Sequence, residues 1–151
     1  MSAQDKASLL PILKSTPEFK PIEVDVAEEV IDSYLNHGTE SGYHIEVAED
    51  EGKVLGYVCF GETPCTVGTF DIYWIAVDKE RRGRSVGKTL SDVAEKAIKE
   101  AGGRLIIIET SSVPLYENTM KFYLARGYEV IARIPDFYMV GDDKIILQKK
   151  L

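Results

Sequence analysis

Apolar side chains recur along this chain at two periods, and the two periods divide it into helices and strands. Recurrence every three to four positions is typical of one buried helix face, and strict alternation is typical of a half-buried strand. Pro17 and Pro21 separate the first two segments. The pattern predicts, in chain order, helices over residues 4–15 and 22–36, strands over 43–49, 54–61 and 69–77, a helix over 85–101, a strand over 105–108, a helix over 116–126, and strands over 128–134 and 144–151 joined by a loop over 135–143.

The segment from residue 69 to residue 108 carries the strongest fold signal. A strand, an amphipathic helix that stops at Gly102 and Gly103, and a second strand follow one another directly. Such a crossover is right-handed, so its two strands are expected to run parallel. Residues 105–108 are uninterrupted apolar, as in a strand that is covered on both faces. These observations predict an α/β fold built around this parallel pair.

Length and composition are those of one domain. The chain has 151 residues, of which 44% are apolar, so a single domain over residues 1–151 with a full hydrophobic core is expected. No run approaches the roughly 18 to 20 apolar residues of a membrane span, and the first residues lack a signal-peptide pattern. We therefore expect a cytoplasmic protein without a membrane partner. Cys59 and Cys65 are interpreted as buried thiols, and no cluster of ligand residues implies a metal.

Charge is unevenly distributed along the chain. The net charge is -7, and residues 1–52 hold twelve Asp and Glu against three Lys. Nucleic acid is not expected as a partner, because phosphate contacts require a basic face. An acidic surface would attract a cationic or amine-bearing acceptor. A solvated acidic face that only promotes solubility explains the same composition.

One basic turn stands out against this acidic background. Five cations fall between residues 79 and 88, where a strand runs into the start of a helix. Free amides and the helix dipole make such a start a binding site for phosphate. Gly83 and Gly87 enclose three residues, one fewer than a Walker A loop needs, and a dinucleotide fingerprint needs a third glycine. A nucleotide-binding loop misread by one residue remains an alternative.

These residues resemble the GNAT superfamily of N-acetyltransferases, whose pyrophosphate motif is Gln/Arg-x-x-Gly-x-Gly/Ala. Residues 82–87 match the motif at Arg82 and Gly87, while Ser85 stands where the family usually has Gly. Serine would keep the amide and offer a hydroxyl as a cap, and we expect it to adopt ordinary backbone angles. The resemblance continues in order through residues 105–110 and 121–128, with some similarity to ribosomal-protein alanine acetyltransferases.

The resemblance implies a mixed, mostly antiparallel sheet with helices on both faces and a central parallel pair that splays to admit coenzyme A. The family's first edge strand is expected to be absent, because the first helix starts almost at Met1. Acetyl-CoA is implied as cosubstrate. Its pantetheine arm would follow Ile75, Ala76 and Val77, and either Asn118 or Tyr116 would also contact it. Its pyrophosphate would rest on the segment made of Arg82, Gly83, Arg84, Ser85, Val86, Gly87, Lys88 and Thr89.

The resemblance also implies catalytic residues. Tyr123 matches the general acid that protonates the departing sulfur. Glu109 resembles the base of the alanine acetyltransferases, and its place after four apolar strand residues suggests a buried carboxylate of raised basicity. Asp71 is the rival base, acting directly or through water. Tyr138 and the Asp142-Asp143 pair would lie near the acceptor, although a solvated hairpin tip explains them equally well.

The predicted function is transfer of an acetyl group from acetyl-CoA directly to a primary amine. A non-catalytic acyl-CoA-binding sensor with the same fold is the alternative. The sequence leaves the acceptor open among a polyamine, an amino acid, an antibiotic, a peptide amino terminus and a lysine. Family members often dimerise through their last strands, so a homodimer is possible.

Overall fold

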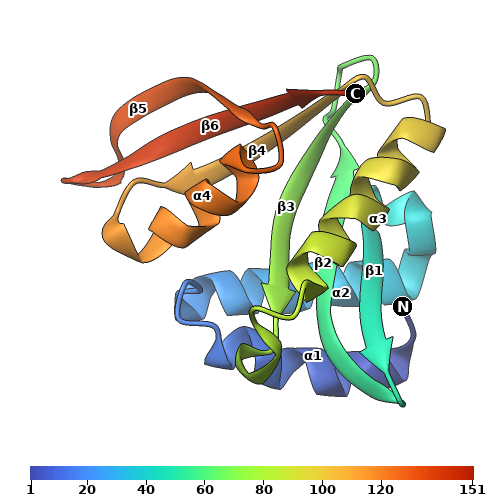
Figure 1. Cartoon of the computed structure of the whole chain (residues 1–151). Helices are drawn as coiled ribbons and strands as arrows, with labels where there is room; N and C mark the ends of the chain where they lie inside the picture. The colour runs from blue at the N-terminus through green and yellow to red at the C-terminus, as the bar shows by residue number, and fades with distance from the viewer.

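The computed structural model describes residues 1–151 as a six-stranded sheet covered by helices on both faces (Figure 1). Three short 3-10 turns, Gly38–Ser41, Lys79–Arg81 and Pro114–Tyr116, lie in the connections. The main elements are α1 (Ala3–Ser15), α2 (Pro21–His37), β1 (His44–Asp50), β2 (Lys53–Glu62), β3 (Thr69–Val77), α3 (Val86–Glu100), β4 (Leu105–Ser111), α4 (Glu117–Leu124), β5 (Glu129–Met139) and β6 (Asp142–Lys150).

The strand order is β1-β2-β3-β4-β6-β5, and every neighbouring pair is antiparallel except β3 and β4. The predicted parallel pair and the mixed, mostly antiparallel sheet are thereby confirmed. No strand precedes α1, so β1 is the edge of the sheet on that side. The parallel pairing is short, because only residues 69–71 of β3 pair with residues 105–107 of β4. Beyond that point the two strands diverge, as Figure 1 shows.

A bulge in β3 lies just past the point of divergence. Phe60 of β2 pairs with Ile72, and the preceding Cys59 pairs with Trp74, so Tyr73 has no partner residue in β2. One extra residue reverses the alternation of side chains in the rest of the strand. As a result Ile72 and Ile75 pack into the core beneath α3, while Trp74 faces the opposite layer.

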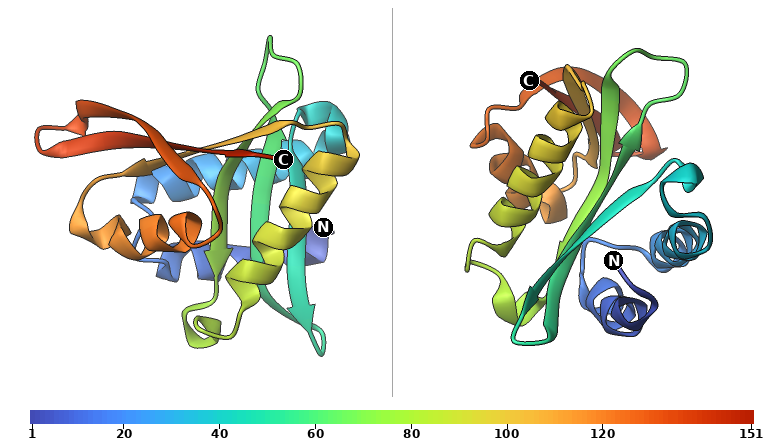
Figure 2. Two further views of the ribbon diagram at one scale, coloured as in Figure 1. Left: turned by 45° about the horizontal axis from the view of Figure 1, so that its top comes forward. Right: turned by 90° about the vertical axis from the view of Figure 1, so that its right-hand side faces the viewer.

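Two hydrophobic cores lie on the two faces of the sheet. Figure 2 shows α3 on one face and α1 and α2 on the other. On one face α3 contributes Leu90, Ala94 and Ile98, three positions of one helical stripe. On the other face α1 and α2 pack against β1 and β2 through side chains such as Leu9 and Ile31. The three helices therefore bury most of the apolar positions that their spacing indicated, whereas Val26 of α2 and Val93 of α3 are exposed.

The carboxyl-terminal hairpin differs from the prediction. Residues 135–139 were expected in a loop, but they belong to β5, and only residues 140–141 separate it from β6. The pairing of β5 with β6 skips from Ile134 to Met139, and Asp136 has a φ of +52°. Pro135 and Asp136 thus form an irregularity within a strand pair, where the sequence suggested a chain reversal. The expectation of two buried thiols is also wrong for Cys65, which is exposed.

No helix combines the length and the apolar run that a membrane span requires.

Candidate functional site

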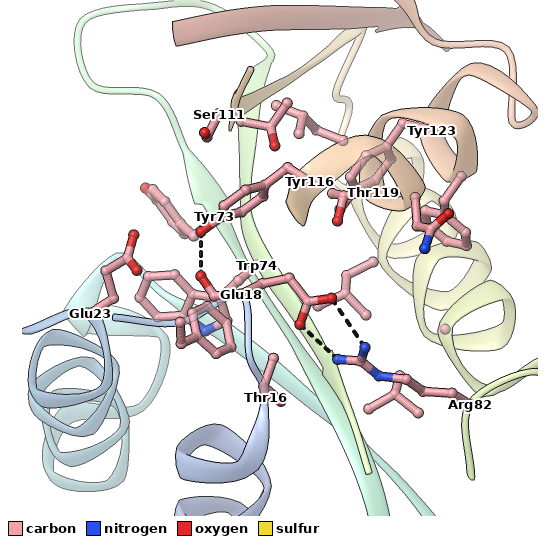
Figure 3. A pocket seen from close by; sticks show the side chains of 18 of the residues that line it. Thr16, Glu18, Glu23, Tyr73, Trp74, Arg82, Ser111, Tyr116, Thr119 and Tyr123 are labelled. Carbon is pink, nitrogen blue, oxygen red and sulfur yellow. Dashed lines mark hydrogen bonds and ion pairs between the residues drawn. The ribbon is translucent and has the colours of Figure 1, made fainter. Parts of the chain in front are cut away.

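A cleft of about 680 Å³ opens where β3 and β4 diverge, within the usual size range of small-molecule sites (Figure 3). Its walls come from β3, β4, α4, the turn before α3, the connection between α1 and α2, and β5. No group of three or more His, Cys, Asp or Glu side chains is close enough to hold a metal ion. The polar groups that line the cleft are amides, hydroxyls and charged side chains.

The start of α3 presents unused amides to the cleft. The backbone N–H groups of Ser85, Val86, Gly87 and Lys88 donate to no acceptor within the protein. They form the first turn of the helix, where intrahelical acceptors are lacking. The amide of Thr89 is already engaged, since it donates to the carbonyl of Ser85 at 2.9 Å. Four adjacent donors at the positive end of a helix dipole make an anion site.

Ser85 adopts the left-handed backbone conformation, with a φ of +63°. The expectation of ordinary angles at this position is wrong. Its hydroxyl makes no capping bond either. A left-handed conformation costs a residue with a Cβ roughly 1–2 kcal/mol, so the turn retains the shape that glycine would favour although serine occupies it.

Gly87 leaves room that the protein itself does not use. A Cβ built there would lie 3.6 Å from Cγ2 of Val77 and 3.9 Å from Cε2 of Phe122, which are ordinary contact distances. The fold therefore tolerates a larger residue at Gly87, and packing within the protein does not account for its small size.

The predicted coenzyme residues divide into two groups by position. Nine of the twelve line the cleft, and Arg84, Thr89 and Ala76 do not. Ala76 is buried in the core beneath α1 and α2. Arg81 also lines the cleft, although the motif did not single it out. The nine are Ile75, Val77, Arg82, Gly83, Ser85, Val86, Gly87, Lys88 and Asn118.

Tyr123 lines the cleft from α4 and is almost completely buried. Its ring packs edge-on against Phe122 and Tyr128, with centroids 5.0 and 5.3 Å away. Burial raises the pKa of Tyr123 well above that of a free phenol. The hydroxyl makes no hydrogen bond within the protein, so it stays protonated and available as a donor.

The two candidate bases lie in different surroundings. Glu109 lines the cleft, but its side chain is 48% exposed and forms an ion pair with Lys144 at 2.6 Å. The burial that its place in the sequence suggested is not found, because Glu109 faces outward from a strand whose neighbours Ile108 and Thr110 point inward. Asp71 accepts a hydrogen bond from Thr63 at 2.6 Å and lies outside the cleft lining.

The two alternatives for coenzyme contact near α4 are now distinguishable. The hydroxyl of Tyr116 donates to the backbone carbonyl of Glu18, and burial raises its pKa to about 12. The side chain of Asn118 lines the cleft and makes no hydrogen bond within the protein. Asn118 therefore has the free amide, while Tyr116 holds the connection between α1 and α2.

The acidic pair in the hairpin is engaged within the protein. Asp142 accepts from the hydroxyl of Ser111 at 2.5 Å, and Asp143 accepts from Arg133 and from the amide of Asp136. Both residues are buried, at 3% and 8% exposure, so of the two alternatives the solvated tip does not describe them. These bonds shape the hairpin, and only Tyr138 of this segment reaches the cleft.

Sequence reasoning missed one wall of the cleft entirely. The connection between α1 and α2 and the first turns of α2 contribute Glu18, Phe19, Lys20, Ile22, Glu23 and Val26. The only local hint was the exposed apolar pair Ile22 and Val26, spaced one turn apart on α2. Glu18 forms a two-pronged ion pair with Arg82, which Figure 3 shows. The Glu18 carboxylate therefore binds the Arg82 guanidinium, which the motif predicted to contact phosphate.

Comparison with known proteins agrees with this geometry. The sequence profile of the acetyltransferase (GNAT) family matches residues 9–128. Human N-acetyltransferase 8B is 26% identical over 149 residues, which cover 88% of this chain and 64% of that protein. The chain therefore spans less than two thirds of the length of this curated relative.

Solved structures extend the comparison. A GNAT-family protein from Desulfovibrio desulfuricans superposes with a TM-score of 0.95 and 39% identity, over 98% of this chain and 93% of that one. An aminoglycoside 6'-N-acetyltransferase complexed with coenzyme A superposes with a TM-score of 0.78 and 18% identity, over 99% and 92%. Because the identity to this second structure is only 18%, the similarity shows a shared fold alone.

Proposed function

The chain belongs to the acetyltransferase (GNAT) family, and we propose that it transfers an acetyl group from acetyl-CoA directly to a primary amine. One observation carries the proposal: four unused amides at the start of α3 stand at the mouth of a cleft between two diverging strands. A diphosphate suits the amides, and an extended arm suits the unpaired side of β3. The coenzyme-bound relative of the same fold supports this ligand.

The coenzyme would contact both β3 and the start of α3. Its pantetheine arm would lie along the backbone of residues 75–77, which pair with β2 on one side only. Its pyrophosphate would accept from the amides of residues 85–88, with Arg81 and Lys88 contributing positive charge from the cleft wall. Arg82 can contribute once its guanidinium is shared with, or released by, Glu18.

The reaction requires three proton transfers. A protonated amine must lose a proton before it attacks the thioester carbon, and Glu109 is a carboxylate of the cleft wall that can accept it, directly or through water. The carbonyl oxygen would gain negative charge near the backbone of β3. The C–S bond then breaks as Tyr123 gives its proton to the sulfur, and the nitrogen gives up its second proton to the Tyr123 oxygen, directly or through water, so that a neutral amide and a free thiol leave. The high pKa of Tyr123 keeps this proton in place until the thiolate forms.

Calorimetry with acetyl-CoA and a thiol-release assay with a panel of amines test the proposal. Micromolar binding and amine-dependent thiol release are expected. Glu109→Gln is expected to lower turnover about 100-fold, the lower end of the usual contribution of a general base. Asp71→Asn is the matched control, and a loss confined to that variant would transfer the role to Asp71. Absence of any heat with acetyl-CoA, or better thermal protection by ATP, would refute the coenzyme assignment.

The alternative function is a non-catalytic acyl-CoA-binding sensor. The observation in its favour is that Glu109 is paired with Lys144 instead of being held in a dry site. Under this alternative acetyl-CoA binds, but no amine in the panel releases thiol. Binding without turnover in every case would favour the sensor.

A second copy of this chain is the partner that the surface suits. β5 is the outer strand of the sheet, and its exposed apolar side chains lie beside an unpaired backbone edge. Two identical edges can pair antiparallel about a two-fold axis and cover these side chains. The side chains are Val130, Ile131, Ile134, Phe137 and Met139. Light scattering is expected to give a dimer mass and Ile131→Glu a monomer, while a monomeric unmodified protein would refute this arrangement.

A further inference from the structure

The half of the cleft beyond the coenzyme positions is an aromatic chamber, defined here by Phe19, Tyr73, Trp74, Tyr116 and Tyr138. All five side chains line the cleft. Phe19 and Tyr73 pack on Trp74 with centroids 6.4 and 6.2 Å away. They come from four separate parts of the chain and meet only here. The chamber offers flat apolar faces where an acceptor would have to approach the thioester.

Exposed aliphatic side chains extend this apolar surface. Ile22 and Val26 lie one helical turn apart on α2, are 66% and 45% exposed, and both line the cleft. Exposed apolar groups gathered at a concave site favour an apolar ligand surface. Phenols are neutral near pH 7, and burial together with nearby carboxylates raises the pKa of Tyr73 and of Tyr116 further, to about 12. The five aromatic side chains themselves therefore carry no negative charge.

The carboxylates of the cleft are largely engaged by the protein itself. Glu18 is paired with Arg82, and Glu109 is paired with Lys144. One oxygen of Glu23 accepts the backbone amide of Lys20 at 2.6 Å. The four cationic side chains of the lining outnumber these three carboxylates. The cleft wall therefore carries no excess of negative charge. The carboxylate oxygens left without a partner are one of Glu23 and one of Glu109, which suit a single ammonium group better than a polycation.

The connection that carries Glu18 and Lys20 forms one wall of the chamber. The carboxylate of Glu18 is tied to Arg82, and its carbonyl accepts the hydroxyl of Tyr116. Lys20 lies 5.7 Å from the ring centroid of Tyr138 and 4.0 Å from a carboxylate oxygen of Asp142. Figure 3 shows Glu18 between the basic turn and Tyr116. A wall tied on both sides limits the width of the chamber, which favours a small acceptor.

We propose that the acceptor is a small primary monoamine carried on a flat aromatic body, as in an arylalkylamine. The inference rests on the proposed acetyl transfer and specifies its second substrate. The ring would stack among the five aromatic side chains, and the amine would point along β3 toward the thioester. Offset or edge-on aromatic contacts contribute beyond simple burial of area.

Kinetics with matched amines test this inference. We expect kcat/KM for 2-phenylethylamine to exceed that for n-butylamine by at least about 10-fold, since one good aromatic contact plus burial is worth roughly 1.4 kcal/mol or more. Spermidine, kanamycin and a short peptide with a free amino terminus are expected to be poorer than 2-phenylethylamine. Rates are compared at equal concentrations of free base, because the amines differ in basicity.

Variants separate recognition of the acceptor from the chemistry. Tyr138→Ala is expected to raise KM for 2-phenylethylamine about 10-fold, with kcat and the Kd of coenzyme A nearly unchanged. Val67→Ala is the matched control, because Val67 is an exposed apolar residue in the turn between β2 and β3 and lies outside the cleft. Trp74 is the only tryptophan, so quenching of its fluorescence by 2-phenylethylamine in the presence of coenzyme A measures binding without turnover.

The outcomes distinguish the two levels of the argument. Preference for spermidine, kanamycin or the peptide, or an unchanged KM in Tyr138→Ala, overturns the aromatic acceptor while acetyl transfer stands. Failure to bind acetyl-CoA, or to release thiol with every amine, overturns the proposed function itself.

Discussion

The guanidinium of Arg82 forms two parallel hydrogen bonds with the carboxylate of Glu18, 3.1 and 2.9 Å long, although 64 positions separate the residues in sequence. Burial pushes the pKa of Glu18 upward, but the hydrogen bonds from Arg82 and from the backbone outweigh it and hold the pKa below its ordinary value. The carboxylate is therefore ionised near pH 7. The Glu18 carboxylate therefore binds the Arg82 guanidinium, which the sequence motif predicts to contact the phosphates of the coenzyme.

Glu18→Gln is expected to tighten binding of coenzyme A about 3- to 10-fold, because a partly exposed ion pair competes with phosphate for Arg82 by about 1 kcal/mol. Calorimetry at two salt concentrations measures the effect. Glu28→Gln is the control. It also removes one negative charge, but Glu28 lies on α2 outside the cleft and is paired with Lys6. Weaker binding in Glu18→Gln would mean that Glu18 orients Arg82 for phosphate.

Gly87→Ala is expected to separate stability from coenzyme binding. The added methyl group makes ordinary contacts with Val77 and Phe122, and alanine favours a helix over glycine by up to about 1 kcal/mol. Thermal unfolding should therefore shift upward, while the Kd of coenzyme A rises at least about 10-fold because the methyl group occupies ligand space. Thr89→Ala changes a neighbouring side chain outside the cleft and should leave the Kd unchanged. Unchanged affinity in Gly87→Ala would argue against a ligand at this turn.

Ser85→Gly is expected to stabilise the fold by about 0.5–1 kcal/mol, since it relieves a left-handed serine at some cost in unfolded-chain entropy. Chemical denaturation measures the difference. Ser85→Ala retains a Cβ at a φ of +63° and should give no such gain. Equal stability of the glycine and alanine variants would show that the turn is not strained.

Tyr123→Phe is expected to lower turnover about 100-fold or more with little change in coenzyme affinity, because it removes the proton donor for the sulfur. The raised pKa of Tyr123 means that the unmodified enzyme should show no loss of this proton across the usual assay range. Tyr128→Phe removes another buried hydroxyl, bonded to Glu95 and outside the cleft, and is the control. Full turnover in Tyr123→Phe would exclude it as the acid.

Glu95→Gln is expected to destabilise the fold at pH 7 by about 2 kcal/mol, since Glu95 accepts charge-assisted bonds from Lys149 and Arg126. Burial raises the pKa of Glu95, but these bonds outweigh it and the net shift is downward. The stabilisation is therefore complete above the ordinary carboxyl pKa and is lost as the pH falls through the lowered value. Melting temperatures measured from pH 7 to pH 3 should converge for the two proteins. Glu100→Gln, on an exposed carboxylate, should show no such convergence.

Much of the fold and part of the site follow from short-range patterns. The helix and strand periods, the stop at Gly102 and the crossover rule identified the parallel pair β3 and β4, and the basic turn marked the helix start whose amides have no acceptor within the protein. These features depend on residues within about one element of each other. They were predictable because backbone geometry and the helix dipole act over that range.

What the sequence by itself determined about this protein is the order of its elements, the central parallel pair and the basic turn that opens the crossover helix. Only the tertiary structure decided that Glu18 holds Arg82, that Glu109 is exposed beside Lys144, and that Ser85 is left-handed. It also decided that the five aromatic side chains meet in one cleft. One contact that brings them together joins Tyr116 to Glu18, which are 98 positions apart in the chain. Periodicity records which face of an element is buried, whereas the partner of a charge or ring depends on which distant segment packs beside it.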